Sequence, residues 1–330
     1  MSETLRIAKV YICNNYFTGI PKLTDFQVVE ETLGTLNEGD YLVEAKFIRI
    51  SPDPSEITPN STPKAFQLAR IVESRNPSFY VDDFVVGDFG WRTHTIVRAG
   101  TIVEGLQPYV LPEIGPVPKS YGVGLFGVPG IAAYFGLLKV CEVKEGDVIV
   151  VSSAAGAVGS CAGQIARIKG CKIIGITSSE EKCAWLKELH FDHCINYKTD
   201  DITTKLKEYA PEGVDCYFDN VGGEISSAVI YEMKQHGRIC INGATSLYYN
   251  EEKKASEVQS PIKMKMVRME GMNVSRYEDD WYQGLYRNYQ WYFEGVLKCK
   301  ETFIEKFEST SQTFIDVLNG KYFGNVMIKL

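Results

Sequence analysis

The run from Val148 to Gly163 constrains the fold of this 330-residue chain more than any other segment. Residues 148–151 are four β-branched residues, which is typical of a buried parallel strand, and an amphipathic helix is expected over 161–169. Between them, the spacing Ala154-x-Gly156-x-x-Gly159 matches the dinucleotide-binding pattern with alanine in the first glycine position. The run therefore predicts a strand, a turn and a helix that bind a dinucleotide, with a purely structural turn as the alternative.

The small residues of this turn each have a physical reason to be there. Gly156 would let the backbone approach a pyrophosphate, and Gly159 would let the helix pack close to the strand. The N-terminus of the helix that follows favours the negative charge of the phosphates. The candidate cofactor-binding residues of the turn are Ala154, Gly156, Ala157, Val158 and Gly159.

The pattern of expected strands and helices changes at about residue 120. Before it, short strand-like runs such as 41–50 and 84–86 are divided by turns, and prolines 108, 112, 116 and 118 mark a non-helical connection. After it, strands alternate with helices, as in a doubly wound parallel sheet. The expected strands are 148–151, 172–176, 193–196, 214–218 and 238–241, and the expected helices are 131–140, 161–169, 181–189, 202–209 and 225–235. The tail adds a helix over 314–318 and a strand over 326–328 that returns to the first domain. The expected fold class is therefore α/β, with a β-rich domain (1–120 with 296–330) and a Rossmann domain (121–295).

Composition and charge exclude some partners. With a formal net charge of −7, the chain is not expected to bind nucleic acid or an anionic membrane surface. No segment reads as a signal peptide and no apolar run approaches transmembrane length, so a cytoplasmic protein is expected. The nine cysteines include no Cys-x-x-Cys pair and lie mostly in apolar runs, so they are expected to be free thiols in a reducing compartment.

The end of the second strand of the alternating region bears on the choice of cofactor. An NAD-specific fold usually places Asp or Glu about 20 residues beyond the glycines, where it binds the ribose hydroxyls. Here Thr177 and Ser178 stand at that place, and Lys182 lies one turn into the next helix. Hydroxyl groups and an ammonium suit a 2′-phosphate, so the predicted cofactor is NADPH. The alternative makes Lys182 a solvated helix residue, and the nearby Glu180 and Glu181 count against a phosphate.

Polar residues also follow the fourth and fifth strands, at the carboxyl edge where such sheets bind ligands. Asn220 could offer its amide to a nicotinamide ribose, although a plain strand-to-helix turn explains its segment equally well. Gly243 is a further candidate cofactor-binding residue after the fifth strand. The phenol of Tyr248 could hydrogen-bond a substrate carbonyl and stabilise a developing enolate, yet most of the 19 tyrosines are expected to serve packing.

One group of side chains has the composition of a metal site. His190, His193 and Cys194, with Cys183 on the preceding helix, straddle a helix end and a strand start. They would bind zinc only if the fold happened to bring them together, so no metal is predicted.

Five segments carry a resemblance that covers nearly the whole chain and is strongest from 121 to 245. They are Val128-Pro129-Gly130-Ile131-Ala132-Ala133-Tyr134-Phe135-Gly136-Leu137, the run Ala154 to Ser160, Asn196-Tyr197-Lys198-Thr199, Asp215-Cys216-Tyr217-Phe218-Asp219-Asn220-Val221-Gly222-Gly223, and Gly237-Arg238-Ile239. In these segments the chain resembles the zinc-independent branch of the medium-chain dehydrogenase/reductase superfamily.

The resemblance implies a GroES-like first domain, a central Rossmann domain and a homodimer. It implies NADPH-dependent reduction of the carbon–carbon double bond of α,β-unsaturated ketones and aldehydes, such as enones and alkenals, by hydride transfer to the β-carbon. By position in the family's motifs, Lys182 would bind the 2′-phosphate and Tyr197 the adenosine side of the cofactor. Asn220 would approach the nicotinamide ribose, and Tyr248 would be the active-site tyrosine.

The chain departs from the family's pattern mainly in the substrate half. The family usually has Asp-Pro-Tyr-Met-Arg where 51–55 read Ser-Pro-Asp-Pro-Ser, Gly-Gln where 65–66 read Ala-Phe, and asparagine where Tyr322 stands. A proline-rich loop is replaced by the charged segment 251–257. Asp53, if it faces the pocket, would disfavour a carboxylate-bearing substrate. Two alternatives stay open, an NADPH:quinone reductase and a non-catalytic NADPH-binding protein.

Overall fold

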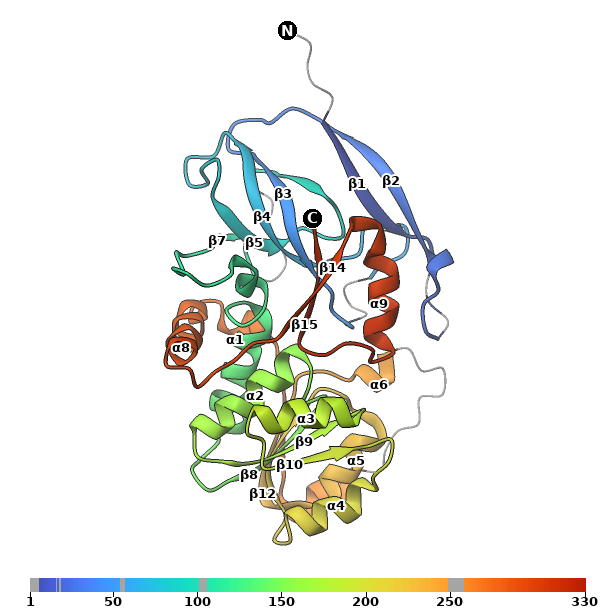
Figure 1. Ribbon diagram of the computed structural model, residues 1–330, viewed down its shortest axis with the longest axis vertical. Helices are drawn as coiled ribbons and strands as arrows, with labels where there is room; N and C mark the ends of the chain where they lie inside the picture. The colour runs from blue at the N-terminus through green and yellow to red at the C-terminus, as the bar shows by residue number, and fades with distance from the viewer. Residues whose placement is uncertain (1–5, 16, 18, 54–56, 101–105, 249–257) are drawn as a thin grey trace. The chain divides into compact units, whose positions relative to one another are not determined.

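The computed structural model describes residues 6–15, 17, 19–53, 57–100, 106–248 and 258–330. Contacts divide the chain into two compact units (Figure 1). The first unit is Met1–Val123, Thr302–Tyr322 and Val326–Leu330, and the second is Gly124–Glu301 with Phe323–Asn325. The C-terminal tail therefore contributes residues to both units. The departures predicted at 54–55 and 251–257 lie outside the described residues.

The first unit is built mainly from antiparallel strands. β1 (Arg6–Cys13) pairs with β2 (Phe26–Leu33), and a seven-stranded sheet has the order β14-β15-β3-β4-β5-β7, with β6 paired to β3. These strands are β3 (Tyr41–Arg49), β4 (Phe66–Ser74), β5 (Phe84–Asp88), β6 (His94–Val97), β7 (Tyr109–Val110), β14 (Glu301–Glu305) and β15 (Asn325–Lys329). α9 (Thr310–Leu318) follows β14. Because β15 pairs with β3, the last strand returns to this unit, as the sequence predicts.

The second unit holds a six-stranded sheet of order β10-β9-β8-β11-β12-β13, in which the paired strands run parallel. The strands are β8 (Val148–Ser152), β9 (Lys172–Thr177), β10 (His193–Asn196), β11 (Val214–Asp219), β12 (Met233–Ile241) and β13 (Arg268–Gly271). The helices are α1 (Val128–Phe135), α2 (Ala157–Ile168), α3 (Glu180–Glu188), α4 (Ile202–Tyr209), α5 (Gly223–Tyr231), α6 (Thr245–Tyr248), α7 (Gln259–Lys265) and α8 (Trp281–Phe293). In Figure 1, α2 and α3 lie on the side of the sheet that faces the viewer.

The strand order reverses between β8 and β11, and this reversal places the ligand-binding edge. From β8 the chain moves to β9 and β10 on one side, and then returns to β11, β12 and β13 on the other. Val150 and Val151 of β8 are fully buried, as expected of a strand covered on both faces. In open sheets of this kind, ligands bind beyond the carboxyl ends of the strands at such a reversal.

Two predicted helices end differently in the structure. The helix expected over 225–235 ends at Tyr231 because Met233 already pairs with Val214 as the first residue of β12. The helix expected over 131–140 begins at Val128 and becomes a π-helix over Gly136–Cys141. A Cβ on Gly136 would lie 2.6 Å from the ring of Phe218, so this glycine allows the helix to pack closely on the sheet.

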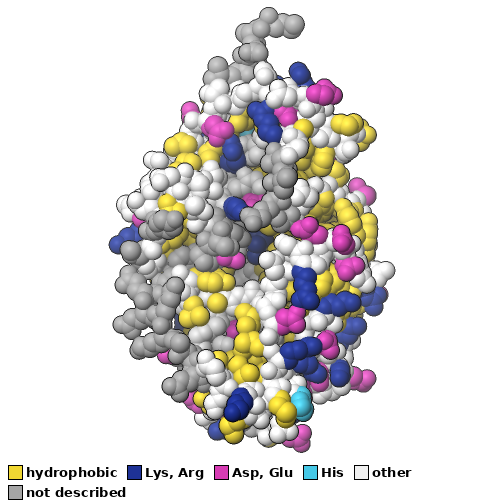
Figure 2. All heavy atoms as spheres, turned by 180° about the vertical axis from the view of Figure 1, so that it is seen from behind, with side chains coloured by type: hydrophobic (Ala, Val, Ile, Leu, Met, Phe, Trp, Pro, Cys, Tyr) yellow, Lys and Arg dark blue, Asp and Glu magenta, His cyan; other side chains and the backbone are white. Residues whose placement is uncertain are grey.

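The surface carries charges of both signs. On the face drawn in Figure 2, Lys and Arg side chains are interspersed with Asp and Glu side chains. Over the residues that the structure describes, no helix combines the length and the apolar character needed to span a bilayer.

Candidate cofactor and active site

The turn between β8 and α2 has the geometry of a phosphate-binding loop. Ser153 has a positive φ of 48°, and the N–H of Gly156 donates to the carbonyl of Ser153 at 2.9 Å. A Cβ on Gly159 would lie 2.4 Å from that same carbonyl oxygen, so only glycine fits there. Gly156 caps α2 without a side-chain hydrogen bond, which leaves the first backbone N–H groups of the helix facing outward from its end.

The end of β9 brings together the hydroxyl and ammonium groups that the sequence singles out. Thr177 is buried as the last residue of β9, and the hydroxyl of Ser179 caps α3 by accepting the N–H of Lys182 at 3.3 Å. The Nζ of Lys182 donates to the hydroxyl of Ser178 at 3.1 Å. Burial, and then the positive charge of Lys198, lower the pKa of Lys182. The ammonium groups of Lys182 and Lys198 therefore repel each other.

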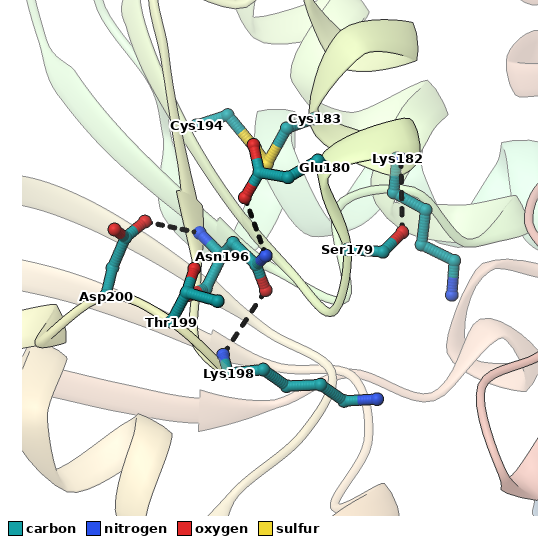
Figure 3. The surroundings of a disulfide bond; sticks show 9 residues. All are labelled: Ser179, Glu180, Lys182, Cys183, Cys194, Asn196, Lys198, Thr199 and Asp200. Carbon is teal, nitrogen blue, oxygen red and sulfur yellow. Dashed lines mark hydrogen bonds between the residues drawn. A yellow bond between two sulfur atoms is a disulfide. The ribbon is translucent and has the colours of Figure 1, made fainter.

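Glu180, the acid that counted against a phosphate, is held by another residue. The side-chain amide of Asn196, at the end of β10, donates to a carboxylate oxygen of Glu180 at 2.7 Å (Figure 3). The same Asn196 accepts the backbone N–H of Lys198 at 3.3 Å. Tyr197, between them, is 43% exposed, and its N–H donates to the carbonyl of Thr177. Figure 3 shows Lys182 and Lys198 extending away from the Glu180–Asn196 contact.

Asp219 joins three strand ends at the carboxyl edge of the sheet. Its Oδ1 accepts the hydroxyls of Ser152 and Tyr217 at 3.1 and 2.8 Å, and the N–H groups of Val221 and Gly222 at 2.9 Å. Its backbone carbonyl accepts the N–H groups of the two residues after β12, at 2.8 and 3.1 Å. The ends of β8, β11 and β12 are therefore fixed relative to one another.

The side chain of Asn220 makes hydrogen bonds within the protein that the sequence did not indicate. Its amide N–H donates to the carbonyl of Ser152 at 2.7 Å, and its side-chain oxygen accepts the amide of Asn242 at 2.8 Å. The side chain is 7% exposed and ties β8 to the segment after β12. Its expected contact with a nicotinamide ribose stays a prediction.

Tyr248 lies at the same edge of the sheet, at the end of the short helix α6. Its phenol oxygen accepts the backbone N–H of Ala244 at 3.0 Å. A Cβ on Gly243 would lie 3.1 Å from the carbonyl oxygen of Asn220 and 3.5 Å from the phenol oxygen. Gly243, Asn220 and Tyr248 are therefore neighbours, as the positions of their segments after two adjacent strands predict.

The tail reaches this unit in a way that sequence reasoning missed. The N–H of Gly324 donates to the carbonyl of Ala155 in the phosphate-binding turn at 2.8 Å. Phe323 packs on Trp185 of α3 with ring centroids 5.3 Å apart, and the ammonium of Lys300 lies 3.8 Å from the Phe323 ring centroid. Tyr322 donates its hydroxyl to Asp316 in the first unit at 3.0 Å. The signal that the sequence offered for this contact is a glycine at position 324. In the structure Gly324 has a φ of 76°, a conformation that favours glycine.

The group considered for zinc contains a disulfide instead. Cys183 and Cys194 are bonded to each other, so the expectation of free thiols is wrong for this pair. His193 stacks on Tyr209 with ring centroids 4.1 Å apart. Within the described ranges, no cluster of three or more His, Cys, Asp or Glu side chains could hold a metal.

The second unit has a doubly wound parallel sheet, with a glycine turn and a lysine site at its carboxyl edge. Together with a β-rich unit in the same chain, this arrangement defines the class of dinucleotide-dependent oxidoreductases. Two family models match this chain. Residues 9–104 match the N-terminal domain of oxidoreductase family, and residues 157–290 match the zinc-binding dehydrogenase family. The chain is 39% identical to prostaglandin reductase 1 of Bos taurus over 98% of this chain and 99% of that protein. It is 32% identical to a 2-alkenal reductase (NADP(+)-dependent) of Nicotiana tabacum, over 97% and 96% of the two chains.

The solved structures agree with these relatives. The structure of CurA from Vibrio vulnificus in complex with NADPH is 27% identical, covers 97% of this chain and 98% of its own, and superposes with a TM-score of 0.90. The chain therefore belongs to the zinc-independent branch of the medium-chain dehydrogenase/reductase superfamily, with the prostaglandin reductases. The family prediction and the fold class, a GroES-like domain with a Rossmann domain, are confirmed.

Proposed function

We propose that this protein is an NADPH-dependent oxidoreductase that reduces the carbon–carbon double bond of α,β-unsaturated ketones and aldehydes. The carrying observation is the contact of Lys182 with Ser178 at the tip of β9, where an NAD-specific protein would present an acid. The names of the relatives, which include prostaglandin, curcumin and 2-alkenal reductases, support this reaction class.

The residues present fit the cofactor. The N–H groups of Ala157, Val158 and Gly159 at the start of α2 would bind the pyrophosphate, because helix N-termini favour anions and a Cβ at Gly159 is excluded. Ala154 and Gly156 shape that turn. The 2′-phosphate would lie against Thr177, Ser178 and Lys182, and Tyr197 would contact the adenosine side. The nicotinamide end would lie near Asn220 and Gly243. When bound, NADPH supplies the hydride that reaches the β-carbon of the substrate.

Tyr248 is the proposed catalytic residue. Reduction at the β-carbon moves negative charge to the carbonyl oxygen, which becomes an enolate. The Tyr248 oxygen accepts an N–H from Ala244, and its own proton can be donated to that oxygen. The hydrogen bond would strengthen as the charge develops and so stabilise the transition state.

The domain assignment and the partners are part of the proposal. Residues 1–120 with 296–330 would form the substrate domain and 121–295 the cofactor domain, which the contact division supports. The expected partner is a small α,β-unsaturated carbonyl compound rather than nucleic acid or a membrane, and the interspersed charges of Figure 2 agree with this. We further propose a cytoplasmic homodimer, by analogy with the family.

The experiment is NADPH oxidation at 340 nm with an alkenal, an enone, an oxo-prostaglandin and a quinone. Turnover of the alkenal or enone is the expected result. Preference for the quinone would favour the quinone reductase alternative, and NADPH binding with no turnover across the panel would favour a non-catalytic protein. The Tyr248→Phe variant should lower kcat about 10- to 100-fold with little change in cofactor affinity. Tyr80→Phe, at a tyrosine that is 66% exposed, is the matched control and should leave turnover unchanged.

A further inference from the structure

The disulfide between Cys183 and Cys194 lies beside the lysines of the proposed 2′-phosphate site. Cys183 directly follows Lys182 in the first turns of α3, and Cys194 lies in β10, two residues before Asn196. Figure 3 shows the bond between helix and strand on one side, with Lys182 and Lys198 extending away from it. A bond at this place controls how the start of α3 sits against the end of β10.

The bond acts together with a hydrogen bond that joins the same two elements. The amide of Asn196 reaches the carboxylate of Glu180 at 2.7 Å, three residues before Cys183. Asn196 also accepts the N–H of Lys198, so the position of Lys198 depends on where the end of β10 lies. The disulfide is the covalent one of these two links, and breaking it leaves the Glu180–Asn196 hydrogen bond as the other.

The two bonded cysteines differ from each other in their exposure to solvent. Six cysteines of the described chain are buried free thiols (Cys13, Cys141, Cys161, Cys171, Cys216 and Cys240), and Cys299 is a partly exposed free thiol. Cys183 is 6% exposed, whereas Cys194 is partly exposed in β10. Cys194 is therefore the more accessible residue of the two, and thiol–disulfide exchange depends on access for the attacking thiolate.

We propose that Cys183 and Cys194 form a redox modification site, which exchanges with small thiols and disulfides and sets the affinity of the protein for the 2′-phosphate of NADPH. The inference rests on the proposed function, since it needs NADPH to bind at Lys182. Disulfides in reducing compartments are usually transient and redox-sensing, which suits a cytoplasmic reductase.

Glutathione disulfide oxidises Cys183 and Cys194 to the disulfide in two exchange steps. The thiolate of Cys194 attacks glutathione disulfide, forms a mixed disulfide and releases one glutathione thiolate. The thiolate of Cys183 then attacks the mixed disulfide, forms the protein bond and releases the second. The two protein thiols lose two electrons and two protons, and one glutathione disulfide becomes two glutathione molecules. A dithiol such as dithiothreitol reverses the sequence.

The oxidised protein holds both ammonium groups in place, so the phosphate finds a preformed site. In the reduced protein the first turns of α3 lose their covalent link to β10 and can move more relative to it, and binding must order them again. Reduction should therefore raise the Kd for NADPH by about 3- to 10-fold. NADH lacks the 2′-phosphate, so its Kd should change little. The ratio of the two affinities is a readout that general destabilisation would not move.

The experiment compares the full-length protein in glutathione disulfide and in dithiothreitol. Alkylation followed by mass spectrometry should show Cys183 and Cys194 protected in the first and labelled in the second. The Kd values of NADPH and NADH are measured in both states. Cys194→Ser, and the double variant Cys183→Ala with Cys194→Ala, should match the reduced protein under either condition. Cys299→Ser, which keeps the bond, should respond like the wild type.

The outcomes separate the inference from the function on which it rests. A bond that never forms in glutathione disulfide overturns the inference, and so does an NADPH-to-NADH affinity ratio that is the same in both states while the enzyme turns over. In both cases the proposed function stands. Failure to bind NADPH in either state overturns the function and the inference together.

Discussion

At the residue scale, single atoms decide whether the phosphate-binding turn can form. Replacing Gly159 by alanine would place a Cβ 2.4 Å from the carbonyl oxygen of Ser153 and 2.8 Å from the Cα of Ala154, and both of these are backbone atoms. The turn must shift, so we expect a loss of about 1–3 kcal/mol in unfolding free energy and at least tenfold weaker NADPH binding. Chemical denaturation and cofactor titration measure both.

Gly271→Ala is the matched control for this variant. Its Cβ would meet nothing within 4 Å, and it lies at the end of β13 in the same unit. If the two alanine variants bind NADPH equally well, the close approach at Gly159 does not matter for the cofactor.

Lys182 should decide which nicotinamide cofactor is preferred. Lys182→Ala removes an ammonium group from the proposed phosphate site, so the Kd of NADPH should rise about 10- to 100-fold, as expected for a partly buried charge contact. The Kd of NADH should stay within about twofold. Lys187→Ala, an exposed lysine on the same helix, is the control. An equal loss for both cofactors would show that Lys182 supports the fold of α3 rather than the phosphate.

Asp40 should make the first unit sensitive to acid. The N–H groups of Ala99 and Asn37, together with the guanidinium of Arg98, lower the pKa of Asp40 to about 2 from 3.8. A lowered pKa means that the ionised group stabilises the folded state above its ordinary pKa. That stability is lost as the pH falls from about 4 to about 2.

The test is the unfolding free energy measured between pH 6 and pH 2. Asp40→Asn should be less stable at pH 6 and should show a flatter dependence on pH below about 4. Glu38→Gln, at an exposed acid two residues away, should keep the wild-type slope. A wild-type slope in Asp40→Asn would contradict the assignment.

At the scale of elements, the ends of β8, β11 and β12 depend on one buried carboxylate. Asp219→Asn removes the negative charge from the oxygen that accepts two hydroxyls and two N–H groups, so these four hydrogen bonds become neutral ones. We expect a loss of about 1–3 kcal/mol in unfolding free energy, because hydrogen bonds to an ionised acceptor are stronger than those to a neutral one. Because Tyr248 and Gly243 follow β12, turnover should fall as well. Asp279→Asn, at an exposed position of the same unit, serves as the control for denaturation and turnover.

The link between α3 and β10 should also appear as thermal stability. A disulfide that closes a loop with a sequence separation of 11 contributes about 3 kcal/mol through the unfolded chain. Scanning calorimetry of the second unit's transition should show a lower Tm in dithiothreitol than in glutathione disulfide. The variant without both cysteines should have the lower Tm under both conditions.

Much of the second unit could be predicted at this scale, because hydrophobic periodicity is strong there. The strand over His193–Asn196 and the helix over Ile202–Tyr209 have the bounds that the sequence predicts. The sequence predicts that the helix over 225–235 continues past Tyr231, where α5 ends. This end could not be foreseen, because apolar and helix-forming residues continue up to the strand that begins at Met233. In these cases pairing with a neighbouring strand overrides local preference.

The site was predictable only in part. Glycine spacing indicated the turn, and position after a strand indicated Tyr248, because both signals are local in the sequence. The contact of Glu180 with Asn196 and the bond of Cys183 to Cys194 depend on how a helix packs against the next strand, and no spacing encodes that.

At the scale of the whole molecule, the last strand holds the first unit together. β15 lies between β14 and β3, and Met327 and Ile328 are fully buried. Deleting residues 326–330 removes both side chains, each of which contributes about 1.5–3 kcal/mol on burial. The shortened protein should lose cooperative unfolding of the first unit in circular dichroism. Deleting only Leu330, which is 40% exposed, is the control, and an unchanged melting curve for the longer deletion would contradict the prediction.

The hydrogen bond from Gly324 to Ala155 affects the order in which the protein folds during its synthesis. Domains generally fold in order as they leave the ribosome, the N-terminal one first. Here the phosphate-binding turn needs Gly324, which comes after the whole parallel sheet in the chain, and the first sheet needs the strand β15 that follows Gly324. The first unit therefore cannot be completed before the second has been synthesised, and the cofactor site stays unfinished until Gly324 has been added.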